Sequence, residues 1–160
     1  MKILFLDIDG VLNYENCTAR CGMYYGIEDD KVTLLKQVVD ATGAKIVLSS
    51  TWRLGMNNEG HRLAEHAVYM NEKFSAQGLE IYDVTEELHR SGGFRGEEIN
   101  EWLSRNSDVT EWVVLDDEWF WDFNQYDIRQ HLVHTSPYLG LTEEDVKKAI
   151  DILNGNLNEE

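Results

Sequence analysis

Cysteine and proline are both scarce in this sequence of 160 residues, and each scarcity excludes a class of protein. The two cysteines, Cys17 and Cys21, are too few for a disulfide framework or for a structural zinc site of four ligands. We therefore expect two reduced thiols. The only proline, Pro137, leaves no Pro-rich linker along the chain. We predict one domain over residues 1–160.

Long apolar runs are also missing. No segment approaches the ~18 apolar residues that a membrane span needs, and the apolar run at the N-terminus ends at Asp7, too early for a secretory signal. These absences predict a soluble cytoplasmic protein without a membrane partner.

Basic residues are few: 14 Lys and Arg stand against 30 Asp and Glu, which gives a formal net charge of -16. A surface this acidic repels phosphate backbones at long range. Extended nucleic acid is therefore a disfavoured partner, unless a local basic patch overrides the overall field.

What the chain does have is a regular alternation of short apolar runs with helical patterns. The apolar runs predict strands at residues 2–6, 45–49, 79–84, 112–115 and 130–134. Apolar residues at helical spacing predict helices at residues 29–39, 59–74, 96–104 and from 142 to about 155. This alternation predicts an α/β fold, a three-layer sandwich around a parallel, Rossmann-like sheet of about five strands.

Polar residues follow directly after several of these runs, where the strands of such a sheet end. Asp7 and Asp9 follow the first run, and Asp116 and Asp117 follow the fourth. Ligands bind beyond the carboxyl ends of parallel strands, and a cluster of carboxylates suits a hard dication such as Mg²⁺. A turn or a helix cap would explain Asp9-Gly10, but not Asp7 directly after a buried strand or a second acidic pair after another strand.

In order, the motifs resemble those of the haloacid dehalogenase (HAD) superfamily of aspartate-nucleophile phosphatases. They are Asp7-Ile8-Asp9-Gly10 after the first strand, Ser49-Ser50 after the second, Arg95 ahead of the fourth, and Asp116-Asp117 after it. The Ser-Ser-x-Trp-Arg run at 49–53 and the late Gly140-Leu141-Thr142 are similar to a capless subgroup that includes phosphatase-like domains of RNA-repair proteins.

This resemblance implies a phosphomonoesterase in which Asp7 attacks phosphorus and forms an aspartyl-phosphate. Asp9 would protonate the leaving oxygen and then activate water. Mg²⁺ would be held by Asp7, by the backbone carbonyl of Asp9, and by Asp116 or Asp117.

The resemblance also implies a phosphate-binding set. Ser50 would bind the transferring phosphoryl group, with Ser49 as the neighbouring alternative. Arg95 stands where a lysine is more common, and would bind both phosphate and Asp7 with a planar fork in place of a point charge. Arg53 is expected to contact substrate phosphate, with pairing to a surface acid as the alternative. Asp122 is either part of a longer acidic motif or an ordinary loop acid.

The predicted elements leave no room for a large cap domain, only for a small flap at residues 13–28. Its residues Tyr14, Met23, Tyr24 and Tyr25 either stack on a substrate or order the flap by local packing. An open site suits a phosphate that projects from a larger molecule, such as a polynucleotide end, and also permits a small ester.

Three other functions remain open. The same residues could make a nucleic-acid-end phosphatase of repair, acting on 3′ or 5′ phosphates. They could transfer the phosphoryl group to another acceptor, or accept it without hydrolysis as a binding module. A signalling receiver would place its acidic pair after the first strand and its phospho-acceptor after the third, an order that this sequence lacks.

Overall fold

The computed structural model describes residues 1–56 and 64–159. Within them lies a parallel sheet with the strand order β5-β4-β1-β6-β7. Its strands are β1 (Lys2–Leu6), β4 (Lys45–Leu48), β5 (Ile81–Val84), β6 (Glu111–Asp116) and β7 (Leu132–His134). The first and most buried strand therefore runs through the middle of the sheet, with β4 and β6 on either side.

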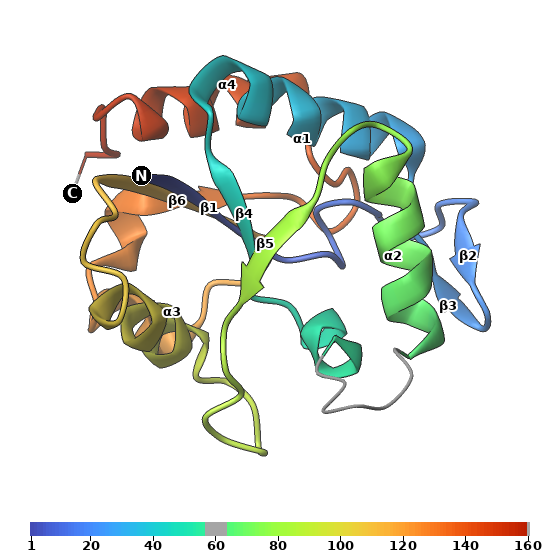
Figure 1. Cartoon of the computed structure of the whole chain (residues 1–160), viewed down its shortest axis with the longest axis horizontal. Coiled ribbons are helices and arrows are strands. Elements are labelled where there is room, and N and C mark those ends of the chain that lie inside the picture. The colour runs from blue at the N-terminus through green and yellow to red at the C-terminus, as the bar shows by residue number, and fades with distance from the viewer. Residues whose placement is uncertain (57–63, 160) are drawn as a thin grey trace.

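Helices cover both faces of this sheet (Figure 1). One face packs against α1 (Asp29–Thr42), α2 (Glu65–Ser75) and α4 (Glu143–Leu153), and the other against α3 (Arg95–Ser104). Successive side chains of β1 alternate between the two cores, because Leu4 and Leu6 face one layer while Ile3 and Phe5 face the other. The predicted three-layer α/β sandwich is confirmed.

The helix ends follow from local chemistry. α1 stops at Gly43, whose φ of 70° is left-handed and whose N–H donates to the carbonyl of Val39 at 2.8 Å. α4 begins with a capping box, in which Thr142 and Asp145 each bind the other's backbone N–H. None of the described helices has the length and apolar character to cross a membrane.

Some predicted boundaries were wrong. The fifth strand begins at Leu132, because the preceding Ile128–His131 forms a 3-10 turn (η3). α2 begins at Glu65, and the earlier start predicted at Glu59 lies in residues outside the described ranges. Two further 3-10 turns, η1 (Thr51–Gly55) and η2 (Trp121–Asn124), were not predicted.

The segment predicted as a small flap contains an antiparallel pair of two-residue strands, β2 (Arg20–Cys21) and β3 (Tyr24–Tyr25). The base of this hairpin is fixed to the body of the protein. The N–H of Ile27 donates to the Tyr69 hydroxyl of α2 at 3.0 Å, and a Cβ at Gly26 would overlap that hydroxyl. No large cap domain is present among the described residues.

Candidate active site

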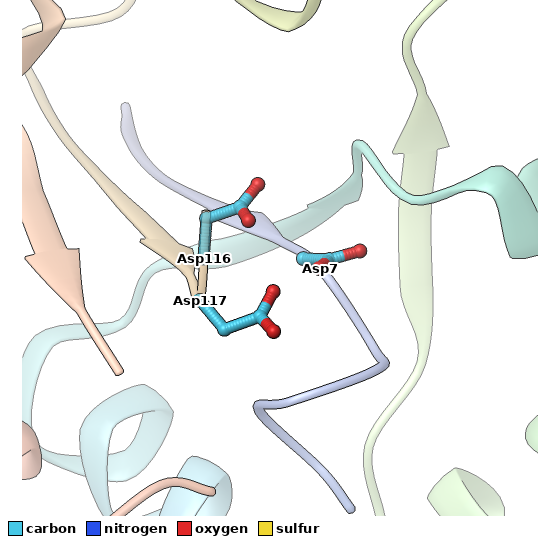
Figure 2. A group of neighbouring side chains, drawn as sticks. All are labelled: Asp7, Asp116 and Asp117. Atoms are coloured by element: carbon cyan, nitrogen blue, oxygen red, sulfur yellow. The ribbon is translucent and has the colours of Figure 1, made fainter. Parts of the chain in front are cut away.

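Three carboxylates gather where two neighbouring strands end (Figure 2). Asp7 directly follows β1, Asp116 is the last residue of β6, and Asp117 comes next. The N–H of Asp7 donates to the carbonyl of Leu115 at 3.0 Å, which continues the ladder between the strands. One oxygen from each carboxylate lies within 4.8 Å of the others.

Burial makes these charges costly. It raises the pKa of Asp7, and it raises the pKa of Asp116 well above the ordinary range with added repulsion from Asp7. Burial and the charge of Asp7 together raise the pKa of Asp117 to about 6. Carboxylate oxygens are the ligands that Mg²⁺ prefers, and a dication would relieve the repulsion. The donor set therefore fits Mg²⁺.

A buried guanidinium faces the same carboxylates. Nη1 of Arg95 donates to Oδ2 of Asp116 at 2.7 Å and lies 3.5 Å from Oδ1 of Asp7. Burial alone would lower the pKa of Arg95, but the attraction of Asp116 and Asp7 raises it above its usual value. Arg95 is the first residue of α3, and its guanidinium carbon lies 4.7 Å from the centre of the Phe120 ring. The cation is thus held beside the Asp7 carboxylate.

The two serines after β4 differ in what they touch. The Ser50 side chain lies close enough to Asp7 to oppose the rise in the pKa of its carboxyl group, and Ser50 Oγ accepts from the N–H of Trp52 at 3.2 Å. The Ser49 hydroxyl is fully buried and has no hydrogen-bond partner among the described residues. Of the two, Ser50 is the one that the structure brings to Asp7.

Asp9 lies outside the cluster of three carboxylates and faces another way. Its Oδ1 accepts from Nδ2 of Asn13 at 2.9 Å, and its Oδ2 accepts from Nε1 of Trp52 at 3.2 Å. A metal contact from Asp9 would therefore have to come from its backbone carbonyl, as the resemblance implies. The turn after it requires glycine, because Gly10 has a φ of 79° and a Cβ there would overlap the Asp117 carboxylate.

Residues 3–146 match the family described as the HAD domain in Swiss Army Knife RNA repair proteins. The chain belongs to this family. No curated protein and no solved structure matched the sequence. Membership confirms the HAD superfamily resemblance and its RNA-repair-like subgroup, and it supports a role of the phosphohydrolase type.

In this HAD domain Asp122 holds a helix in place. Its two carboxylate oxygens accept from the N–H groups of Gly96 and Glu97 at 3.0 and 2.9 Å, at the N-terminus of α3. A Cβ at Gly96 would overlap Asp122, so the close approach requires glycine. Asp122 is buried and is not part of the carboxylate cluster. It therefore fixes the start of the helix that carries Arg95.

Arg53 is buried inside the HAD domain and bonded through its two terminal nitrogens, whereas its Nε has no hydrogen-bond partner among the described residues. Its Nη2 donates to Oε2 of Glu98 at 2.8 Å, and its Nη1 donates to the carbonyls of Ser49 and Ser50 at 3.0 and 3.2 Å. Burial lowers the pKa of Arg53 and raises that of Glu98, so burial outweighs their mutual attraction. Arg53 joins the serine loop to α3. Its contact with substrate phosphate stays a prediction.

Two residues at the site were not assigned from the sequence. Asn13 accepts from the N–H of Gly10 at 2.9 Å while it binds Asp9, and so fixes the turn after the nucleophile motif. The Thr135 hydroxyl donates to the carbonyl of Gly10 at 2.7 Å, and its N–H donates to the carbonyl of Asp116 at 3.0 Å. Thr135 directly follows β7, so the strand-end rule applied to the last strand would have found it.

Proposed function

We propose that this HAD domain is a Mg²⁺-dependent phosphomonoesterase that acts through an aspartyl-phosphate on Asp7. One observation carries the proposal: the Asp7 carboxylate lies beside both a buried cation, Arg95, and two further carboxylates, Asp116 and Asp117. A phosphate dianion needs the cation, whereas the carboxylates need a metal ion. A site with both a cation and a metal ion offsets the repulsion between the carboxylate nucleophile and the phosphate, so that the carboxylate can approach phosphorus.

Asp7 and Asp117 are the better candidates for direct metal ligands. Both oxygens of Asp116 already have donors, Nη1 of Arg95 at 2.7 Å and the N–H of Glu118 at 2.9 Å. The Asp117 carboxylate instead lies within 4.8 Å of an Asp7 oxygen, and burial together with the charge of Asp7 raises its pKa to about 6, as expected of two carboxylates that would share a cation. When bound, Mg²⁺ would offset the repulsion between the attacking carboxylate and the phosphate.

The residues of the chain then have separate roles in the reaction. Arg95 and Ser50 bind the phosphate oxygens and align phosphorus with the Asp7 carboxylate. A bond forms from Asp7 to phosphorus as the ester P–O bond breaks, and Asp9 gives its proton to the leaving oxygen. Asp9 then takes a proton from water, which attacks the aspartyl-phosphate and releases inorganic phosphate.

The isosteric variant Asp7→Asn tests this mechanism, because an amide cannot form the acyl-phosphate. We expect phosphate release from an aryl phosphate with Mg²⁺ to fall by at least about a thousandfold, while the thermal unfolding midpoint stays close to that of the unmodified chain or rises. Asp30→Asn, at an exposed position of α1, is the matched control and should keep full activity. Activity that survives in Asp7→Asn, or that persists with a chelator, would contradict the proposal.

A second candidate is a phosphatase for 3′ or 5′ ends of nucleic acid, favoured by the family's description as a domain of RNA repair proteins. Oligonucleotides with one terminal phosphate, compared with the matching mononucleotides, test this candidate. A phospho-accepting module without hydrolysis would instead be labelled stoichiometrically and release no phosphate.

A further inference from the structure

A pocket of about 420 Å³ opens beside Asp9, and Arg95 is not among the described residues that line it. Its walls come from three separate parts of the chain: Tyr24 and Tyr25 of the β2–β3 hairpin, Trp52 of η1, and His66 of α2. This volume lies in the range of small-molecule sites, which runs from about 300 to about 1,000 Å³. Among the seven described residues that line the pocket, four carry rings, and they lie next to the residue proposed to protonate the leaving group.

The inner wall is held rigidly. The indole Nε1 of Trp52 donates to Asp9 at 3.2 Å, and the Trp52 carbonyl lies 3.0 Å from Nε2 of His66. The rings of Trp52 and His66 also meet edge to face, with centroids 5.7 Å apart. A wall fixed in this way binds a ligand at little further entropic cost.

The hairpin wall is anchored as well. Glu28 Oε1 accepts from the N–H groups of Thr18 and Ala19, both at 3.0 Å, and so fixes the loop that leads into β2. The Tyr25 hydroxyl accepts from the N–H of Asn16 at 3.0 Å, while Arg20 covers the Tyr25 ring at 4.6 Å. Tyr25 therefore orders the hairpin. Tyr24 is 78% exposed, and its ring is available to a ligand.

Charge limits what this pocket can hold. Among the described residues that line it there is no lysine or arginine, whereas Asp9 supplies a negative charge. A leaving group with a phosphate of its own would meet the negative charge of Asp9 here, and no cation among the described lining residues. Aromatic walls favour a flat ring, because rings stack on them and add about 1–3 kcal/mol per base in nucleic-acid complexes.

We infer that this pocket is the leaving-group subsite of the HAD domain, and that it takes an uncharged, flat ring system of the nucleoside class, stacked on Tyr24. The inference rests on the proposed function, since it assigns the pocket to the group that Asp9 protonates. A free nucleoside monophosphate and the phosphorylated terminal nucleotide of a strand present the same nucleoside to this pocket, and the phosphodiester of the strand would have to lie outside it.

The first arm of the test compares kcat/KM for a nucleoside monophosphate with that for glycerol phosphate, which has a small leaving group without a ring. We expect Tyr24→Ala to lower the ratio of the two values by about fivefold or more, the equivalent of about 1 kcal/mol of stacking. Tyr24→Phe should restore the ratio. Met23→Ala is the matched control, because Met23 is 93% exposed on the same hairpin and does not line the pocket.

The second arm measures binding of the free nucleoside to the Asp7→Asn variant by calorimetry, with no turnover required. Binding that Tyr24→Ala weakens supports the inference even if no ester is hydrolysed, in which case only the proposed function fails. An unchanged substrate ratio in Tyr24→Ala, or no detectable nucleoside binding, would overturn it. Oligonucleotides with a terminal phosphate, assayed beside the mononucleotide, show which source supplies the nucleoside.

Discussion

At the scale of the residue, the charge of Arg95 acts on the same carboxylates that a metal ion would bind in the candidate active site. Its guanidinium lies 2.7 Å from Asp116 and 3.5 Å from Asp7, and all three side chains are buried. Charges a few ångströms apart interact by several kcal/mol even at an effective dielectric constant of about 20. The same cation that would bind phosphate therefore competes with a metal ion for the carboxylates.

This competition predicts opposite effects of Arg95→Gln on two measurements. Phosphate release should fall by at least about a hundredfold, while Mg²⁺ affinity at pH 8, measured by calorimetry, should rise by at least about tenfold. Arg95→Lys keeps the charge and should leave Mg²⁺ affinity nearly unchanged while it lowers turnover, because an ammonium lacks the planar fork. Normal turnover in Arg95→Gln would remove Arg95 from the mechanism.

The sequence located the carboxylates better than it located their partners. Asp7, Asp116 and Asp117 could be predicted because each follows an apolar strand, and parallel strands end at one edge of the sheet. The contacts of Arg53 could not be predicted in this way. Its partner Glu98 lies 45 residues along the chain on α3, and no local pattern records which acid a basic side chain will meet.

At the scale of the element, the position of α3 decides where Arg95 points. Arg95 is the first helical residue, and the next two N–H groups donate to Asp122. An N-terminal acid satisfies unpaired N–H groups and interacts favourably with the helix dipole. Asp122 therefore acts on the site through the helix.

Asp122→Ala should lower the free energy of unfolding by about 1–2 kcal/mol, and it should lower turnover because α3 loses its anchor. Asp122→Asn keeps one acceptor oxygen and should lose less of both. Urea unfolding and steady-state kinetics measure these effects. Mg²⁺ affinity should stay within about twofold in both variants, since Asp122 lies outside the carboxylate cluster. A large loss of Mg²⁺ affinity would instead make Asp122 part of the metal site.

Elements were predictable where a pattern was long enough to repeat. The apolar runs that end at Asp7 and Asp116 are buried on both faces of the sheet, and α1, α3 and α4 were found within a few residues of their predicted bounds. The β2–β3 hairpin has two residues per strand, too few for an alternation. The residues before Leu132 look like the start of a strand, but their backbone turns as a 3-10 helix that packs Ile128 into the core.

At the scale of the whole molecule, the acidic charge and the buried carboxylates oppose folding in the same pH range. The formal net charge is -16, and self-repulsion grows as carboxyl groups ionise. The pKa of Asp117 rises from 3.8 to about 6 on folding, and those of Asp7 and Asp116 rise as well. A raised pKa means that the folded state binds protons more tightly than the unfolded state does.

In the absence of a metal ion, the contribution of these carboxyl groups to the stability of the fold falls as the pH rises. Without metal, the stabilisation from protonated Asp117 is fully present below about pH 4 and is lost as the pH rises through about 6. Mg²⁺ would bind the ionised carboxylates, so protons and the metal would compete for them. Metal binding should therefore stabilise the chain at pH 8, by about 2.7 kcal/mol when free Mg²⁺ is 100 times its dissociation constant, and should do little at pH 5.

Thermal unfolding from pH 5 to pH 8, with Mg²⁺ or with chelator, measures this dependence. The gain in unfolding midpoint on adding Mg²⁺ should grow with pH, mostly between pH 5 and pH 7. NaCl at matched ionic strength controls for screening of the acidic surface. Asp117→Asn should lose most of the gain at every pH, whereas Asp30→Asn should keep it. A gain that is equal at pH 5 and pH 8, or that NaCl reproduces, would mean that Mg²⁺ screens the surface and does not bind the buried carboxylates.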